Sequence, residues 1–326
     1  GAGGERREGG GEGGGGGGGG GGGMRVTVMG AGIFGLSVAW ALIRRGAAVR
    51  VLDRVAPGAG ASGGLVGALA PHVPEAWNDK KAFQFESLAM AETWWDAVTA
   101  AAGGMAPGFA RSGRLQPLAD AGAVALAQTR AEGAARLWQG RAAWRIVGPD
   151  PDWTGWAPPS PTGLWVHDTL SARISPRAAC RALVAAIGQA GGVIGQGTEP
   201  GAGQDAVVWA TGVAGLEALG RDLGREAGCG VKGQAASLRP ARDLRALPQV
   251  FADGLHLVPH ADGTVAVGST SERDFVDPAA VDAQLEALIA RARAICPALA
   301  NAPVVARWAG LRPRATSRAP LIGPWP

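Results

Sequence analysis

The clearest pattern of apolar and polar positions lies between residues 24 and 53. A short apolar run around Val26 and Val28 leads into a glycine-rich turn, and small and apolar residues at helical spacing follow as far as Gly46. A second apolar run then ends at the acidic Asp53. Apolar runs of this length are typical of strands, and apolar spacing of three to four residues is typical of helices. The stretch therefore predicts strand, turn, helix and strand.

The turn has the spacing GxGxxG and suits the binding of a dinucleotide. Gly30 permits a tight turn, Gly32 lets the backbone approach a pyrophosphate, and Gly35 lets the helix pack closely on the strand. The unpaired amides at the start of the helix face the phosphate charge, and Asp53 can accept hydrogen bonds from a ribose hydroxyl. The chain has 55 glycines, so the spacing alone is weak evidence. The order of strand, turn, helix, strand and acid carries the prediction.

The rest of the chain alternates between helical and extended patterns. Ser175 and Pro176 are typical of a helix start, and Asp262-Gly263 between alternating apolar residues is typical of a hairpin turn. The segment 138–166 holds five tryptophans among prolines and predicts loops that cover a sheet. We expect helices at 82–100, 121–137, 176–187 and 278–295, strands at 114–118, 192–194 and 205–212, and the hairpin at 254–268.

Composition places the chain among folded proteins. It has 326 residues, of which 47% are hydrophobic and 18% charged, which suggests two intertwined domains with a substantial core. No apolar stretch reaches the roughly 20 residues of a membrane span. Three scattered cysteines without metal-ligand spacing favour buried thiols in a reducing compartment. We therefore expect a cytoplasmic protein without a metal site.

The basic balance of the chain is poor evidence for a polyanionic partner. Lysine and arginine number 31 in total, but the lysines are only Lys80, Lys81 and Lys232, and the arginines are dispersed. This skew is typical of GC-rich coding sequence, so we expect no nucleic-acid partner. Residues 1–23 are mostly glycine and predict a disordered tail without the apolar region of a signal peptide. Met24 is then the expected natural start.

A second small-residue run follows Asp53. From Gly58 to Gly64 the residues are too small and flexible for a regular element, and their amides with Ser62 could lie against phosphates or a flat ring. The alternative is a flexible surface loop. The apolar Leu65 and Val66 that follow would be poor surface residues, which favours the binding loop.

Together, the turn at 30–35, Asp53 and the segment GASGGLVGALAPH at 60–72 resemble the D-amino-acid-oxidase-like flavoproteins, which include glycine and sarcosine oxidases. Later segments extend the resemblance over 24–326: Ala-Thr-Gly at 210–212, a strand at 230–234, the hairpin, WAGLRP at 308–313 and LIGP at 321–324. The resemblance implies FAD and an α/β fold. It pairs a Rossmann-like FAD-binding domain with a parallel sheet (24–90, 170–228 and 305–326) and a substrate domain with a mixed or antiparallel sheet (91–169 and 229–304).

The resemblance also implies particular site residues. Arg312 matches the arginine that binds the substrate carboxylate, a task for which a guanidinium is well suited. His256 would hydrogen-bond that carboxylate or accept the ammonium proton; a solvent-facing histidine is the alternative. Arg314 would share the strand face of Arg312, and His72 suits a structural bond. The cofactor-binding residues are Gly30, Gly32, Ile33, Phe34, Gly35, Asp53, Arg54, Ala61, Ser62, Gly63, Gly67, Ala210, Thr211 and Gly212.

The function implied is oxidation of the C–N bond of a small amine or amino acid, by hydride transfer to flavin N5. Molecular oxygen or another acceptor would then reoxidise the flavin. Two alternatives remain: the flavin domain of a tRNA wobble-uridine modification enzyme, which GASGxxxGAL also resembles, and a non-catalytic truncated flavoprotein. Family members have a longer meander where this chain has only residues 195–204, and they continue past LIGP with a strand and a helix. We therefore expect a shortened meander and a C-terminally incomplete chain.

Overall fold

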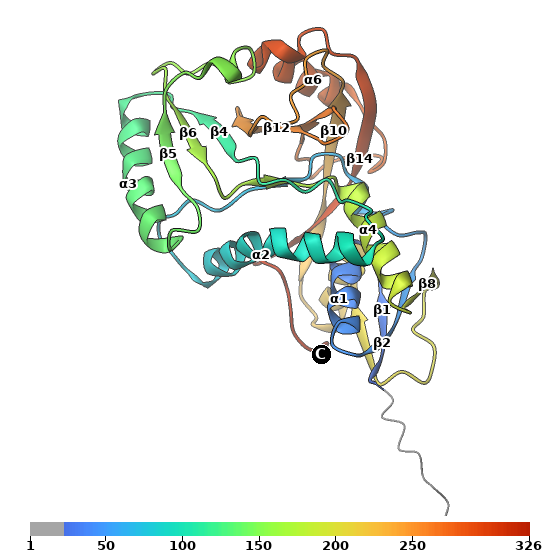
Figure 1. Ribbon diagram of the computed structural model, residues 1–326. Coiled ribbons are helices and arrows are strands. Elements are labelled where there is room, and N and C mark those ends of the chain that lie inside the picture. Colours follow the sequence, from blue (N-terminus) through green and yellow to red (C-terminus); the bar gives the residue numbers. More distant parts are fainter. Residues whose placement is uncertain (1–22) are drawn as a thin grey trace, which may run out of the picture.

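The computed structural model describes residues 23–326, so the predicted tail at 1–23 lies, apart from Gly23, outside the described residues. Two sheets dominate the molecule, a four-stranded sheet in the lower part of Figure 1 and an eight-stranded sheet above it. The first sheet contains β1 (Arg25–Met29), β2 (Ala48–Asp53), β8 (Val193–Gln196) and β9 (Ala206–Trp209). The second contains β4 (Arg114–Pro117), β5 (Trp144–Val147), β6 (Trp165–Asp168), β10 (Gly228–Leu238), β11 (Gln249–Ala252), β12 (Leu255–Pro259), β13 (Val265–Gly268) and β14 (Val304–Ala315).

Six α-helices are placed around these sheets in the described chain. They are α1 (Ile33–Ile43), α2 (Asp79–Ala101), α3 (Ala121–Leu137), α4 (Pro176–Gln189), α5 (Gly212–Asp222) and α6 (Ala283–Ile295). The short strands β3 (Ala68–Leu69) and β7 (Ala172–Arg173) pair separately. Among residues 23–326, no helix combines the length and the apolar character that crossing a bilayer requires.

The four-stranded sheet is parallel, in the order β8-β2-β1-β9. Buried Val28 of β1 and Val51 of β2 pack with Leu36 of α1 and with Leu183 and Ile187 of α4, so the apolar faces of the helices close one core with the sheet. The predicted strand–turn–helix–strand unit is therefore confirmed. The connection from β8 to β9 is a short loop, which confirms the expectation of a shortened meander.

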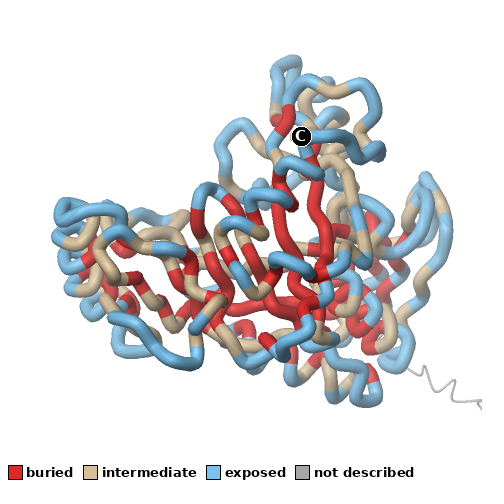
Figure 2. The backbone as a smooth tube through the Cα atoms, turned by 90° about the horizontal axis from the view of Figure 1, so that it is seen from above, coloured by how far each residue is buried: buried red, intermediate tan, exposed pale blue. Residues whose placement is uncertain are grey.

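The eight-stranded sheet is mixed, in the order β14-β10-β13-β12-β11-β4-β6-β5. Strand β10 pairs with the edge strand β14 along all of its 11 residues, and most residues of β10 are buried. Figure 2 shows buried segments through the middle of the molecule and exposed segments around its rim. One face of the sheet packs on α6, where Leu257 and Val267 meet Leu285 and Ile289. On the other face, Ala235 of β10 and Ala266 of β13 pack with Leu65, which follows the second glycine-rich run. This α/β architecture with one parallel and one mixed sheet is the predicted fold class.

Helix α2 contributes to two cores. Its C-terminal half supplies Trp95 and Val98 to the core of the parallel sheet, and its N-terminal half supplies Phe85 and Leu88 to the core under α3. Figure 1 shows the helix lying between the two sheets. The predicted domain division at residues 90 and 91 falls within this helix, and it stays a prediction.

Three sequence-based expectations were wrong in detail. The segment 138–166 is not only loop, because its ends form parts of β5 and β6, where Trp144 and Trp165 are buried. Helix α6 begins at Ala283 and not near Pro278, because the Asp282 side chain accepts a hydrogen bond from the Gln284 amide and caps the helix there. Cys229 is exposed, although Cys180 and Cys296 are buried as expected.

Candidate active site

The glycine turn between β1 and α1 leaves no room for side chains at two positions. Gly30 has a φ of +101°, and a Cβ there would lie 2.4 Å from the Ala210 carbonyl oxygen. A Cβ on Gly35 would lie 1.8 Å from the Gly30 carbonyl oxygen. Only glycine allows this turn and this approach of helix to strand. The steric roles predicted for Gly30 and Gly35 are confirmed.

The carboxylate of Asp53 braces the same turn. One of its oxygens accepts a hydrogen bond from the Ala31 amide at 2.8 Å, and the other accepts one from the Val55 amide at 2.9 Å. Carboxylate oxygens have further lone pairs, so these bonds leave acceptor capacity for a ribose hydroxyl. The neighbouring Arg54 is exposed, and its carbonyl accepts a hydrogen bond from Gln196 at 3.0 Å.

The small-residue segment after β2, residues 58–67, is called the second glycine loop here, and it rests on the start of α1. The Ser62 hydroxyl accepts a hydrogen bond from the Ile33 amide at 2.9 Å, and it would lie 3.2 Å from a Cβ on Gly32. Among the hydrogen bonds of the described chain, none gives the amides of Gly32 and Phe34 an acceptor. The site therefore combines free amides, a hydroxyl and the positive end of a helix dipole, which suits a pyrophosphate.

Other predicted cofactor residues lie at the same edge of the parallel sheet or brace the loop. Ala210 follows β9 and contacts Gly30, Thr211 precedes α5, and Gly212 has a φ of +62°. Ala61 and Gly63 bound a short 3₁₀ turn around Ser62. Gly67 meets a packing demand, since a Cβ there would lie 1.8 Å from the Ile174 carbonyl oxygen.

The mixed sheet meets the second glycine loop through small residues. The Trp308 indole lies against Gly310 and Gly64, where added Cβ atoms would stand 2.6 Å and 3.7 Å from the ring. Buried His260 donates from Nε2 to the Leu65 carbonyl at 3.0 Å, and burial lowers its pKa. His260 thus joins the loop to the sheet, a role that sequence spacing did not reveal.

Arg312 lies on this face of the sheet. Its side chain passes over Gly233 of β10, where a Cβ would stand 2.9 Å from the Arg312 Nε. It donates to the Ser269 hydroxyl at 2.9 Å and to the Thr270 carbonyl at 2.8 Å, while its buried Nε has no partner in the described chain. Burial, followed by the charge of Arg314, lowers the pKa of Arg312. Of the two arginines, only Arg312 donates a side-chain hydrogen bond within the described chain, so they are not equivalent.

His256 lies on β12, beside the strand that leads into the Arg312-binding residues Ser269 and Thr270. It pairs across strands with Gly268, the residue before Ser269, and its ring packs 4.7 Å from the ring of Phe251. Its Nδ1 is buried and has no partner among the described residues. Burial, with a smaller effect of Arg114, lowers the pKa of His256 to about 4. The imidazole is therefore neutral near pH 7, which favours a hydrogen-bonding role over acceptance of a proton.

Arg114 and His72 both have structural partners. Arg114 forms a buried ion pair with Asp168 at 2.9 Å and lies over the Phe251 ring. His72 has a structural partner, since its amide donates to the Gln84 side chain at 2.6 Å and its imidazole contacts the same oxygen. Among residues 23–326, no group of three or more histidine, cysteine or acidic side chains could hold a metal ion.

Comparison with known proteins agrees with this geometry. The DAO family, described as FAD dependent oxidoreductase, matches residues 25–326. A protein of Rhizobium etli named as a thiamine biosynthesis oxidoreductase, ThiO, is 30% identical over 314 residues, which cover 92% of this chain and 87% of that protein. The glycine oxidase of Pseudomonas putida is 42% identical over 112 residues, which are 34% of this chain and 29% of that enzyme.

Solved structures give the same fold. The crystal structure of glycine oxidase from Geobacillus kaustophilus superimposes with a TM-score of 0.75 at 20% identity, covering 92% of this chain and 86% of that chain. Because the family match spans nearly all of the described residues, the assignment does not depend on a single motif. The chain belongs to the DAO family of FAD-dependent oxidoreductases.

Proposed function

We propose that the protein oxidises the C–N bond of a small amino acid and that Arg312 binds the substrate carboxylate. The observation that carries this proposal is that the Arg312 guanidinium is held in place and still has free N–H donors. It is half-buried on the sheet face that meets the glycine loops, and two of its five N–H donors are held by Ser269 and Thr270. The remaining donors suit a bidentate pair with a carboxylate.

The residues at the glycine turn fit FAD. The free amides of Gly32 and Phe34 and the start of α1 suit its pyrophosphate, and Asp53 retains acceptor capacity for its ribose. Gly32 and Gly63 have no side chains that would occupy the space beside Ser62. When bound, FAD supplies a two-electron acceptor for the hydride on the carbon that bears nitrogen.

The protein's own side chains would orient the substrate. Arg312 fixes the carboxylate and thereby the direction of the C–N bond. His256, neutral and with a free Nδ1, offers a hydrogen bond to a polar group of the same substrate. Its low pKa makes it a weak base at neutral pH, so we assign it binding and orientation and not proton removal.

The test is anaerobic reduction of the flavin in the purified, FAD-loaded protein by glycine, sarcosine, proline and D-amino acids. We expect at least one of these compounds to bleach the flavin. Arg312→Met should raise the KM for that compound roughly a hundredfold, because the loss of a charged, bidentate contact costs about 3 kcal/mol. Failure of every amino acid to reduce bound flavin would overturn the proposal. Once a compound has reduced the flavin, exposing the reduced flavin to oxygen and to an artificial acceptor shows which of them serves as the oxidant.

A further inference from the structure

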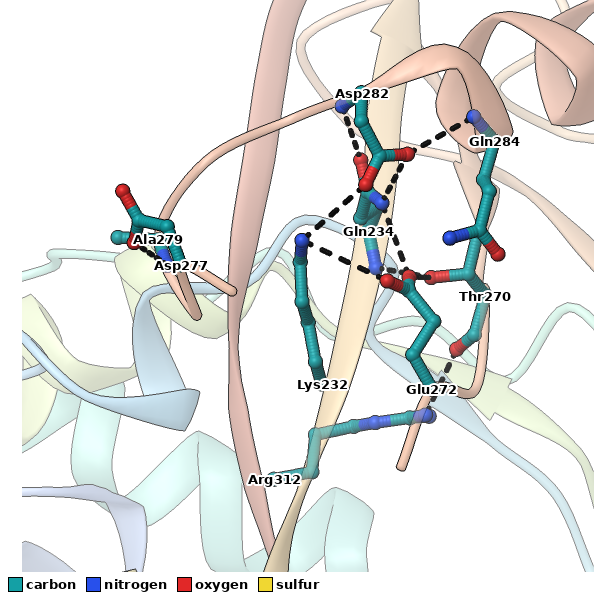
Figure 3. Close-up of polar contacts among 9 residues, drawn as sticks. All are labelled: Lys232, Gln234, Thr270, Glu272, Asp277, Ala279, Asp282, Gln284 and Arg312. Carbon is teal, nitrogen blue, oxygen red and sulfur yellow. Dashed lines mark hydrogen bonds and ion pairs between the residues drawn. The ribbon is translucent and has the colours of Figure 1, made fainter. Parts of the chain in front are cut away.

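A polar cluster, buried except at Asp282, lies on the opposite face of β10 from Arg312. It consists of Lys232 and Gln234 of β10, Glu272 of the segment that follows β13, and Asp282 at the start of α6 (Figure 3). Lys232 and Glu272 are only 3% and 7% exposed, and Gln234 is fully buried. We propose that Lys232, Gln234 and Glu272 are positioning residues, which hold the segment Ser269–Glu272 so that it presents Arg312 to the substrate. This inference rests on the proposed role of Arg312.

The segment after β13 continues alongside β10 by backbone pairing. The Lys232 amide donates to the Glu272 carbonyl at 3.0 Å, and the Glu272 amide donates back to the Lys232 carbonyl at 2.9 Å. The Thr270 amide donates to the Gln234 carbonyl at 3.2 Å. These bonds set the register of residues 270–272 against β10.

The side chains of the cluster then fix the segment from the α6 side. Glu272 accepts a hydrogen bond from Gln234 Nε2 at 3.0 Å and from the Thr270 hydroxyl, and its second oxygen lies 3.6 Å from Lys232 Nζ. Lys232 Nζ lies 3.4 Å from a carboxylate oxygen of Asp282, and Gln234 Nε2 donates to the other at 2.8 Å. The Lys232–Glu272 pair is buried on both sides, and breaking it leaves an uncompensated charge, so each partner constrains the other.

Thr270 connects this cluster to Arg312. Its hydroxyl accepts from the Gln234 amide at 2.9 Å and bonds Glu272, while its carbonyl accepts from Arg312 at 2.8 Å. Side chains on a strand alternate between faces, so Lys232 and Gln234 face α6 whereas the intervening Gly233 lies under Arg312. The cluster therefore acts on the guanidinium only through the segment, without access to the substrate. A displacement of about 1 Å at a binding group can change catalysis by about a hundredfold.

Three substitutions loosen the segment by different means. Glu272→Gln keeps the size of the side chain but sets an amide nitrogen against Lys232 or against Gln234, donor facing donor. Lys232→Met removes the cation between two carboxylates. Thr270→Val replaces the hydroxyl with a methyl group and changes no charge. It provides the test if the two charge-changing variants do not fold. The control is Ile289→Ala, which opens the core under α6 and makes none of the hydrogen bonds of the cluster.

The experiment uses the full chain loaded with FAD and glycolate as the probe, a small carboxylate that has a hydroxyl group in place of the amine. The Kd of glycolate is measured from the change in flavin absorbance. We expect Glu272→Gln, Lys232→Met and Thr270→Val to raise this Kd by 10- to 100-fold, as an order of magnitude, with unchanged FAD content. Ile289→Ala should lower the melting temperature at least as much while leaving the Kd of glycolate unchanged. In an Arg312→Met background, Glu272→Gln should cause no further loss, because coupled residues are not additive.

The outcomes separate the two proposals. If Arg312→Met alone leaves glycolate affinity unchanged, the carboxylate-binding role fails and the positioning role fails with it. If Arg312→Met weakens glycolate binding but Glu272→Gln, Lys232→Met and Thr270→Val do not, only the positioning role is overturned. It is also overturned if Glu272→Gln weakens glycolate equally with and without Arg312, since that result indicates a general structural effect.

Discussion

At the scale of single residues, His256 gives the protein a specific dependence of stability on pH. Burial and then Arg114 lower its folded-state pKa to about 4, whereas an unfolded histidine has a pKa near 6.5. Above pH ~6.5 both states are neutral and His256 has no effect on stability. As the pH falls from about 6.5 towards 4, the unfolded state binds the proton first, so the free energy of unfolding decreases.

The magnitude follows from the same shift. Between pH 7.5 and pH 5, the wild-type protein should lose about 1–2 kcal/mol more stability than a His256→Gln variant, allowing for partial exposure of the ring. Urea unfolding at the two pH values measures this difference. His167 and His260, whose pKa values burial also lowers, are present in both proteins and cancel. Equal losses in the two proteins would contradict the buried environment of His256.

Gly233 is the second residue on which the site depends. A Cβ there would stand 2.9 Å from Arg312 Nε and 3.1 Å from its Cζ, so Gly233→Ala should displace the guanidinium. We expect the Kd of glycolate to rise about tenfold with FAD still bound, because the glycine turn is remote from this change. Gly188→Ala is the matched control, since Gly188 is an exposed helical residue with open space around it. That change should add about 0.5–1 kcal/mol of stability without altering glycolate binding.

At the scale of elements, α1 and its turn depend on one close contact. A Cβ on Gly35 would lie 1.8 Å from the Gly30 carbonyl oxygen, so Gly35→Ala must push α1 away from β1. The helix amides and Ser62 would then move apart, and we expect FAD affinity to fall by at least about a hundredfold. Titration of apoprotein with FAD, followed by flavin fluorescence, measures this. Val38→Ala on the exposed side of α1 should leave FAD affinity unchanged. Equal affinity in the Gly35 variant would show that the contact is not needed.

Local patterns predicted elements well where the signal lies within a few residues. The unit around Gly30, the helix after Ser175 and the hairpin at Asp262-Gly263 are all present, because turn and cap residues act on their own neighbours. Helix α5 was not predicted, since its glycines obscure the helical pattern. Strands β5 and β6 were missed because their tryptophans are buried by α3 and α6, which sequence spacing does not show.

The same contrast holds for the candidate site, where some features follow from local sequence and others depend on distant segments. The steric demands on Gly30 and Gly35 follow from a recognisable turn, so sequence could predict them. The contacts of Arg312 depend on Ser269 and Thr270, which lie some 40 residues earlier in the chain and reach it only through the pairing of the sheet. The difference between Arg312 and Arg314 likewise follows from the register of β14 on β10. Long-range pairing decides such contacts, and a local pattern has no signal for it.

At the scale of the whole molecule, three elements, β10, β14 and α2, hold the parallel and mixed sheets together. Strands β10 and β14 carry the substrate face against the second glycine loop, where Trp308 and His260 make contact. Helix α2 places Leu88 in one core and Trp95 in another. Partial unfolding of either half would therefore expose apolar surface of the other, which favours a single cooperative unfolding transition.

This cooperativity can be tested with two probes on the FAD-loaded protein. Leu88→Ala and Trp95→Ala should each lower stability by about 2–5 kcal/mol, and each should shift the release of flavin and the loss of tryptophan fluorescence together, because α2 belongs to both cores. Met90→Ala, at an exposed position between them, should change stability by less than about 0.5 kcal/mol. Thermal unfolding followed by flavin and tryptophan fluorescence gives both midpoints. If Leu88→Ala shifted the tryptophan midpoint and left flavin release unchanged, the two sheets would unfold as separate units, and α2 would be a linker and not a shared core element.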